Sequence, residues 1–306
     1  MSDFRLKVFR SVAKNLSFTK ASQELFVSQP AITKHIQELE AAYQTRLFDR
    51  QGSRISLTES GNLLLEHCER ILEDYKRLEY EMHLLHNEYT GGLKLGASTT
   101  IAQYVLPPLL ASFIGKFPQV SLSLLNGNSR EIEAALQEHR IDLGFVEGVF
   151  RLPNIRYTTF WEDELVAVVR TGSKLAVGEE ITPDELFHLP LVLRERGSGT
   201  LDVFERALQQ HNIKLSSLQV LMYLGSTESI KLFLEHTDCL GIVSVRSITR
   251  ELYSGQLRVV EIKGMPMLRD FSFAQPQGQE SGLAQVFMQF AMHNNHKLCK
   301  LPKLAY

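Results

Sequence analysis

Residues 16–61, LSFTKASQELFVSQPAITKHIQELEAAYQTRLFDRQGSRISLTESG, decide the fold of the first part of the chain. Ser17 and Ser28 each precede a run of helical periodicity, and a serine hydroxyl is a good N-cap because it accepts a hydrogen bond from a free N–H of the first turn. Pro30 stands in the first turn of the second helix, where its missing N–H costs nothing. The stretch therefore predicts two helices joined by a tight turn, the second over residues 28–41.

The flanking residues extend this pair into a domain. Upstream, the apolar side chains of residues 3–15 recur with a helical period and predict a further helix. Downstream, residues 48–58 hold two short β-like runs around a turn whose glycine adopts a positive φ at little cost. Three helices followed by a basic hairpin describe a winged helix-turn-helix over residues 1–58, with the helix-turn-helix itself at about 18–37.

The polar face of the helix over 28–41 is predicted to contact DNA. Its apolar residues share one face, so its polar side chains project outward. Glutamine and threonine pair with base edges in the major groove, a lysine reaches a guanine or a phosphate, and the wing arginines suit phosphate or minor-groove contact. The alternative is a generic three-helix bundle with a solvated polar face. The predicted DNA-contacting residues are Ser28, Gln29, Pro30, Thr33, Lys34, Gln37, Arg50 and Arg54.

A long helix is predicted to follow, capped by Thr58 and spanning residues 59–89. Its apolar residues recur at intervals of 4 and 3 in alternation, which is the repeat of a coiled-coil seam. A helix packed only on its own domain would show a wider, drifting stripe. The repeat therefore predicts self-association through Leu64, Cys68, Ile71, Tyr75, Leu78, Met82 and Leu85.

From residue 90 onward, strands alternate with helices, which predicts a parallel α/β architecture. We expect a helix over residues 100–114 after the first strand, and Ser129 is expected to cap a later helix. Two such runs predict two Rossmann-like subdomains with a cleft between them. The predicted boundaries are residues 90–162 with 266–295 for subdomain I and 163–265 for subdomain II.

Polar residues follow several strands at the edge where α/β proteins bind ligands. Residues 98–100 and 194–200 each open a helix, and helix N-termini attract anions. Any one hydroxyl is more simply a cap of its own helix, but the two segments together favour an anion site. Glu147 remains open: it binds a cationic group, or it pairs with Arg194 or Arg196. The predicted effector-binding residues are Ser98, Thr99, Thr100, Ser129, Glu147, Arg194, Gly197, Ser198, Gly199, Thr200 and Thr227.

Charge divides the chain into three parts. Residues 1–58 carry nine Lys and Arg against five Asp and Glu, residues 59–90 carry three against eight, and the remainder is nearly balanced, within a net charge of −2. A basic head suits nucleic acid, although its surplus is modest. Cys68, Cys239 and Cys299 are odd in number and far apart, which indicates reduced thiols.

Other classes of protein leave no signal in the sequence. No stretch approaches the roughly 18 to 20 apolar residues of a membrane span, and the N-terminal residues alternate charged and apolar side chains, unlike a signal peptide. A nucleophile elbow, an H-E-x-x-H motif and a P-loop are all missing. We therefore expect a cytoplasmic protein with no catalytic site, no metal, no cofactor and no membrane partner.

The opening stretch resembles the signature of the LysR-type transcriptional regulators. The matching motifs are S-F-T-K-A-S, V-S-Q-P-A-I-T, I-x-x-L-E and L-F-x-R followed by L-T-x-x-G. The resemblance implies that Gln29, Pro30, Thr33 and Lys34 occupy DNA-contact positions. It also implies a linker helix that pairs two protomers, an effector region like a periplasmic binding protein, and a tetramer built as a dimer of dimers, often bending its operator.

The sequence thus predicts a sequence-specific transcription regulator. Its expected partners are a double-stranded DNA operator, a small anionic effector, and further copies of itself. Two alternatives from other classes are an α/β enzyme and a solute-binding protein, each with a fused DNA-targeting head.

Overall fold

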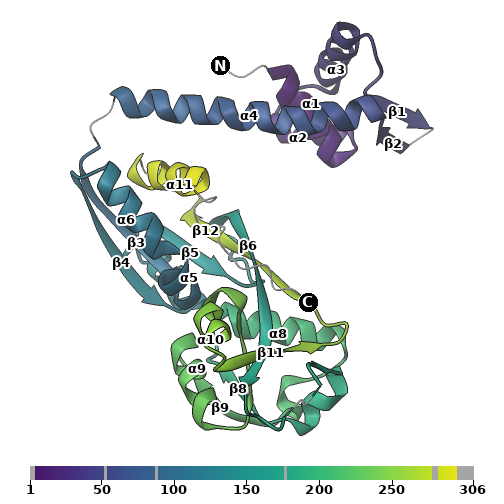
Figure 1. Cartoon of the computed structure of the whole chain (residues 1–306). Helices are drawn as coiled ribbons and strands as arrows, with labels where there is room; N and C mark the ends of the chain where they lie inside the picture. The colour runs from purple at the N-terminus through teal and green to yellow at the C-terminus, as the bar shows by residue number, and fades with distance from the viewer. Residues whose placement is uncertain (1–3, 52–53, 87–88, 176–177, 278–281, 295–306) are drawn as a thin grey trace. The chain divides into compact units, whose positions relative to one another are not determined.

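The residues that the computed structural model of the chain describes are 4–51, 54–86, 89–175, 178–277 and 282–294. They form two compact units (Figure 1). We call Met1–Glu88 the head unit and Tyr89–Tyr306 the α/β unit.

Three helices and a hairpin surround one apolar core in the head unit. α1 packs against α2, α3 and α4, and buried side chains of these helices and of the hairpin fill the space between them. Ser17 Oγ accepts from the N–H of Lys20 and Ser28 Oγ from the N–H of Ala31, which confirms both predicted N-caps. The elements are α1 Phe4–Asn15, α2 Phe18–Leu25, α3 Gln29–Tyr43, β1 Phe48–Gln51, β2 Arg54–Leu57 and α4 Glu59–His86.

The predicted wing is present as an antiparallel hairpin of β1 and β2. Its base is fixed to α3, because the backbone N–H of Leu47 donates to Glu40 Oε1 at 2.8 Å. Thr58 Oγ1 accepts from the N–H of Gly61 at 3.0 Å, which confirms Thr58 as the cap of α4. The wing is therefore tied to helices on both sides.

One residue of the predicted seam on α4 serves the head unit instead. Cys68 is fully buried in the head core, and its thiol donates to the Leu6 carbonyl at 3.2 Å. Burial raises the pKa of this thiol to about 11, so it stays protonated at neutral pH. The prediction of Cys68 as a dimerisation residue is therefore wrong for this structure, because a heptad repeat does not distinguish a partner helix from α1.

Farther along α4, the seam is open to solvent in the single chain. The exposed seam residues are Ile71, Leu78 and Met82. Leu64 and Tyr75 are half-buried, and Leu64 packs at the edge of the head core. Leu85 lies on α4, but its side chain is outside the described residues. Self-association through these side chains remains a prediction.

A mixed sheet of ten strands runs through the described part of the α/β unit, in the order β4-β3-β5-β12-β6-β10-β8-β9, with β11 paired to β6 and β7 to β11. β3 is parallel to β4 and β5, and β8 is parallel to β9 and β10. The long strands β6 and β12 are antiparallel to each other and connect the two groups (Figure 1). We call the β3–β5 group with α5, α6, α7 and α11 subdomain I, and the β8–β10 group with α8, α9 and α10 subdomain II.

This arrangement confirms the two-subdomain α/β fold. The strands are β3 Gly91–Ser98, β4 Val120–Gly127, β5 Leu143–Glu147, β6 Ile155–Arg170, β7 Glu180–Ile181, β8 Leu191–Arg194, β9 Val220–Leu224, β10 Leu240–Ser244, β11 Leu257–Ile262 and β12 Met267–Pro276. The helices are α5 Thr99–Tyr104, α6 Leu106–Lys116, α7 Ser129–Gln137, α8 Gly199–Gln210, α9 Thr227–His236, α10 Thr249–Tyr253 and α11 Gly282–Asn294, with the 3-10 helices η1 Pro183–His188, η2 Leu215–Ser217 and η3 Val245–Ser247. The predicted subdomain boundaries fall within or beside the connecting strands and stay predictions.

The expected helix over residues 100–114 is instead two helices, α5 and α6, which meet at Val105. Pro107 and Pro108 lie in the first turn of α6. Neither has an N–H to donate to the preceding turn, so the helix cannot continue through them.

Contrary to the expectation from the sequence, Ser129 is not the N-cap of α7. Asn128 is the cap, and it forms a capping box with Glu131. Ser129 is the first helical residue, and its hydroxyl donates to the carbonyl of Glu147 at 2.7 Å. The serine therefore ties α7 to the end of β5.

Candidate functional site

The outer face of α3 carries the polar side chains expected to contact DNA. Gln29, Lys34 and Gln37 are exposed, while Ile32 and Ile36 are buried on the opposite face. α3 therefore presents amide groups and an ammonium group, which suit base edges and phosphates.

The hydroxyls near the start of α3 have local partners. Ser28 Oγ accepts from the N–H of Ala31 at 3.4 Å, and Thr33 Oγ1 donates to the carbonyl of Gln29 at 3.1 Å. Ser28 and Pro30 are exposed, and Thr33 is half-buried. These local bonds stabilise the N-terminal turn of α3, on which Gln29 lies.

The wing arginines flank the hairpin turn, as expected. Arg50 lies on β1 and pairs in register with Ile55, and Arg54 lies on β2 opposite Gln51. Their side chains are outside the described residues, so their role in binding DNA stays a prediction.

Arg194 is the central charged group between the two subdomains. Its side chain is 1% exposed, and its Nε donates to Glu195 Oε2 at 2.8 Å. Its two terminal nitrogens reach Thr99 Oγ1 of subdomain I at 3.3 Å and Thr227 Oγ1 of subdomain II at 3.4 Å. One guanidinium thus joins α5 to α9, and two of the other predicted effector residues, Thr99 and Thr227, converge on it.

Glu147 pairs with neither Arg194 nor Arg196 in the described structure. It ends β5 with its side chain buried, and it accepts a short hydrogen bond from Ser98 Oγ. Its Oε1 lies 3.5 Å from Nη1 of Arg269. The ion-pair interpretation of Glu147 is therefore correct in kind but wrong in partner.

Arg269 also connects the site to the strands that cross between the subdomains. Its Nη1 donates to Thr200 Oγ1 at 3.0 Å, and its Nη2 lies 2.7 Å from Asp163 Oδ2. Asp163 and Arg269 face each other in register on β6 and β12, and both are buried. Asp163 also accepts from Ser244 at 2.8 Å and lies 3.4 Å from Arg246. A buried ladder of alternating charge therefore runs from the end of β5 to η3.

Glycine permits the close contact between the subdomains. A Cβ at Gly199 would collide with the carbonyl oxygen and the side chain of Glu147. Gly197 has a φ of +92°, and its carbonyl accepts from the N–H of Arg130 at 3.3 Å. The first turn of α8, capped by Ser198, therefore meets the ends of β5 and the start of α7 backbone to backbone.

The Thr100 hydroxyl is a buried hydrogen-bonding group of this region that the described residues leave unsatisfied. It is fully buried, yet its Oγ1 has no hydrogen-bond partner among the described residues. A buried hydroxyl without a partner carries a desolvation cost, which a ligand atom would remove. α5 has only six residues, so the hydroxyls rather than a helix dipole give this side of the site its polarity.

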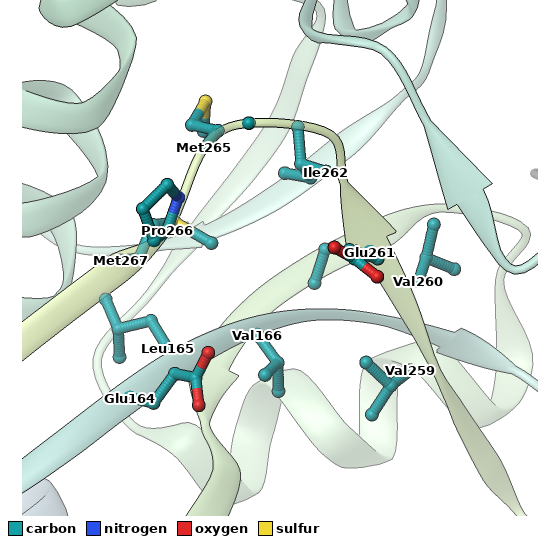
Figure 2. A pocket seen from close by; sticks show the side chains of 12 residues that line it. Glu164, Leu165, Val166, Val259, Val260, Glu261, Ile262, Met265, Pro266 and Met267 are labelled. Carbon is teal, nitrogen blue, oxygen red and sulfur yellow. The ribbon is translucent and has the colours of Figure 1, made fainter. Parts of the chain in front are cut away.

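Two cavities of the α/β unit lie close to this group of residues or outside it. Figure 2 shows a cavity of about 450 Å³ lined by aliphatic residues of β6 and β11 and by the turn through Met265 and Pro266, with the carboxylates of Glu164 and Glu261 beside it. A second, of about 330 Å³, shares Arg269 with the charge ladder and also contacts Arg151 and Arg206. The first cavity contains none of the predicted effector residues.

Sequence reasoning missed Asp163, Arg246 and Arg269. Each lies in or next to a strand whose neighbours are buried, and a charged residue in such a strand is the signal that could have marked it. Within the described ranges, no group of three or more His, Cys, Asp or Glu side chains is arranged to hold a metal ion. Nor is any described helix both long and apolar enough to span a membrane.

Two family models match the chain. "Bacterial regulatory helix-turn-helix protein, lysR family" matches residues 4–62, and "LysR substrate binding domain" matches residues 86–295. A relative in Escherichia coli K12, the uncharacterised HTH-type transcriptional regulator YeiE, is 35% identical over 258 residues, which are 84% of this chain and 85% of the relative.

Solved structures show the same fold. The regulatory domain of CcmR from Synechocystis PCC6803, in complex with 2-PG, matches with a TM-score of 0.61 and 27% identity over 67% of this chain and 97% of that one. CrgA of Neisseria meningitidis, a LysR-type regulator, matches with a TM-score of 0.69 over 98% of this chain and 99% of that one, and at 18% identity it shows the fold alone.

A winged helix-turn-helix joined to a two-subdomain α/β unit defines a DNA-binding transcription regulator with an effector-binding part. The chain belongs to the LysR family of bacterial transcriptional regulators. The predicted family resemblance is therefore confirmed.

Proposed function

We propose that this regulator reads its operator with α3 and the wing, and that a small anion bound between subdomains I and II controls those contacts. The observation that carries the proposal is the convergence of Arg194, Thr99 and Thr227 at the junction of the subdomains. The relatives are regulators and the sequence has no catalytic motif, so the proposal includes no enzymatic activity. Since the proposed target is operator DNA, the proposal places the protein in the cytoplasm.

Three features favour an anion as the effector. Arg194 brings a buried guanidinium that Glu195 pairs along one edge, Thr100 Oγ1 lacks a partner among the described residues, and the first turn of α8 begins at the Ser198 cap beside them. The matched structure of CcmR was solved with 2-phosphoglycolate, which is an anion. Sulfate, sulfite and small carboxylates all fit this chemistry.

The mechanism requires an anion with different affinities for two arrangements of the subdomains, because only such a ligand shifts an equilibrium. The paired protomers would then space their heads differently on the operator. Footprinting the full-length protein on the DNA upstream of its gene tests the proposal. A protected dyad whose length changes with a bound anion is expected, and binding no tighter than to bulk DNA would contradict it.

Exposed apolar residues support an oligomer. They occur on α4 and on two edge strands of the sheet, at Leu124 and Leu125 of β4 and at Leu221, Met222 and Tyr223 of β9. Exposed apolar patches on unpaired edge strands favour association with another chain. We propose pairing through α4 and assembly into a dimer of dimers.

Lys34→Ala should weaken operator binding about tenfold, because α3 loses one charge that faces DNA. If Lys34 contacts a phosphate, the slope of log K against log salt should fall by about 0.9. Fluorescence anisotropy at several salt concentrations measures both quantities. Lys263→Ala, which removes the same charge from the α/β unit, is the control, and equal affinities for the two variants would exclude Lys34 from the interface.

Thr100→Val should weaken anion binding by about fivefold to tenfold and leave anion-free operator binding unchanged. Valine keeps the shape of the buried side chain and removes the unpartnered hydroxyl, which is worth roughly 1 kcal/mol in a net hydrogen bond. Thermal shift of the full chain against a panel of sulfate, sulfite and small carboxylates measures the change. Thr237→Val, at the far end of α9, is the matched control.

A further inference from the structure

A second contact joins the two subdomains at the opposite end of α5 from Thr99. Tyr104 is the last residue of α5, and its hydroxyl donates a short hydrogen bond to Glu228 Oε1 in the first turn of α9. Burial and this hydrogen bond raise the pKa of Tyr104, so the phenol stays protonated and remains a donor. The contact therefore acts at all physiological pH values.

Glu228, the acceptor, belongs to a cluster of charged side chains that lies wholly within subdomain II. Lys231 has a side chain only 5% exposed, and its Nζ lies 2.7 Å from Glu228 and 2.8 Å from Glu251. It also donates to the carbonyl of Ser247 at 2.9 Å. Glu228 therefore faces the Lys231 ammonium and, at longer range, the positive charge of Arg250. Tyr104 adds a hydrogen-bond donor from subdomain I to the same carboxylate.

The pKa of Glu228 agrees with this description. Although its partial burial alone would raise the value, hydrogen bonds from Lys231 and Tyr104 hold the pKa of Glu228 below its usual range. Glu228 is therefore ionised at neutral pH and accepts from both subdomains at once. The Lys231 ammonium also lies 5.3 Å from the centre of the Tyr104 ring, a contact that a phenylalanine would keep.

α5 and α9 are thus joined at two points. Arg194 bonds Thr99 at the start of α5 and Thr227 at the start of α9, and Tyr104 at the end of α5 bonds Glu228, the residue after Thr227. A rotation of one subdomain against the other that changes the first contact must also strain the second. The two contacts together fix the angle of α5 on subdomain II.

We propose that Tyr104 is a positioning residue whose hydroxyl, held by Glu228, latches subdomains I and II in the arrangement seen here. The latch goes beyond the proposed anion site, since it acts between groups of the protein and needs no ligand. It predicts that the arrangement of the subdomains is set partly by one hydroxyl that touches neither DNA nor effector.

Tyr104→Phe in the full-length, ligand-free protein tests the latch. Hydrogen exchange by mass spectrometry should become about tenfold faster in α5 and in the first turn of α9, because a hydrogen bond to a charged acceptor is lost. Acrylamide quenching of Trp161, the sole tryptophan, should also increase. The Trp161 ring lies 4.1 Å from the guanidinium of Arg246 in η3, and Lys231 binds the carbonyl of the next residue, Ser247. Loosening the Glu228–Lys231 cluster should therefore loosen η3 over the ring. The thermal midpoint should move little, since each subdomain keeps its own contacts.

The matched control is Tyr253→Phe, which removes a hydroxyl from an exposed tyrosine of α10. Unchanged exchange and quenching in Tyr104→Phe would overturn the latch. A general loss of protection with a large fall in thermal midpoint would also overturn it, because the hydroxyl would then support the fold rather than the arrangement of the subdomains. Since no ligand is present, a failure of the anion proposal leaves this result unaffected.

Discussion

Arg269→Ala is expected to lower the free energy of unfolding of the α/β unit by about 3 kcal/mol, more than any exposed charge substitution. The substitution removes the guanidinium that lies 2.7 Å from the Asp163 carboxylate and 3.5 Å from the Glu147 carboxylate. Both carboxylates are buried. Asp163 retains Ser244 and the more distant Arg246, which limits the loss. Urea unfolding followed by the emission of Trp161 reports on the α/β unit alone, because the head unit has no tryptophan.

Arg140→Ala is the matched control, since Arg140 forms an exposed ion pair with Glu138 on the same unit. Such pairs contribute about 0 to 1 kcal/mol. Arg269→Lys should fall between the two variants, because lysine keeps the charge and loses the fork that spans Asp163 and Thr200. Equal costs for Arg269→Ala and Arg140→Ala would show that the ladder does not stabilise the fold.

Gly199→Ala should prevent the close contact between the subdomains and reduce the response to an anion by about tenfold to a hundredfold. The added Cβ would collide with the backbone carbonyl of Glu147, which cannot rotate away as a side chain can. Alanine is a better helix former than glycine, so α8 itself should not be weakened. Hydrogen exchange at the end of β5, together with anion-dependent thermal shift, measures the effect.

Gly225→Ala controls for the loss of glycine flexibility. Gly225 also stands between a strand and a helix, but no heavy atom lies within 4 Å of a Cβ placed there. A normal anion response in Gly199→Ala would mean that the arrangement seen here is not the one that responds to the effector.

The sequence predicted the head unit almost residue by residue. Ser17, Ser28 and Thr58 cap their helices through bonds to residues three positions along the chain, and such local bonds can be read from spacing. The inward face of α3 followed from periodicity for the same reason. Where two local rules competed, the outcome was harder to predict: Pro107 and Pro108 divided the expected helix, and Asn128 rather than Ser129 became the cap.

For the candidate site, the sequence predicted which segments come together but not which side chains pair with each other. The strand-to-helix turns at Thr99, Arg194 and Thr227 were expected at one edge of the sheet, and they do converge there. The partner of Glu147 was not foreseen, because Arg269 reaches it from β12, a strand that returns to this place only after the whole of subdomain II.

The winged helix-turn-helix with which the chain begins was therefore determined by the sequence alone, because its caps, turns and periodicity act over a few residues. Tertiary structure alone decided that Cys68 serves the head core, that Arg269 binds Asp163 across 106 residues, and that Tyr104 meets Glu228 across 124. The physical reason is that a buried charge or polar group takes whichever partner the packed chain brings near. Which residue that is depends on the crossing of β6 and β12 rather than on spacing in the sequence.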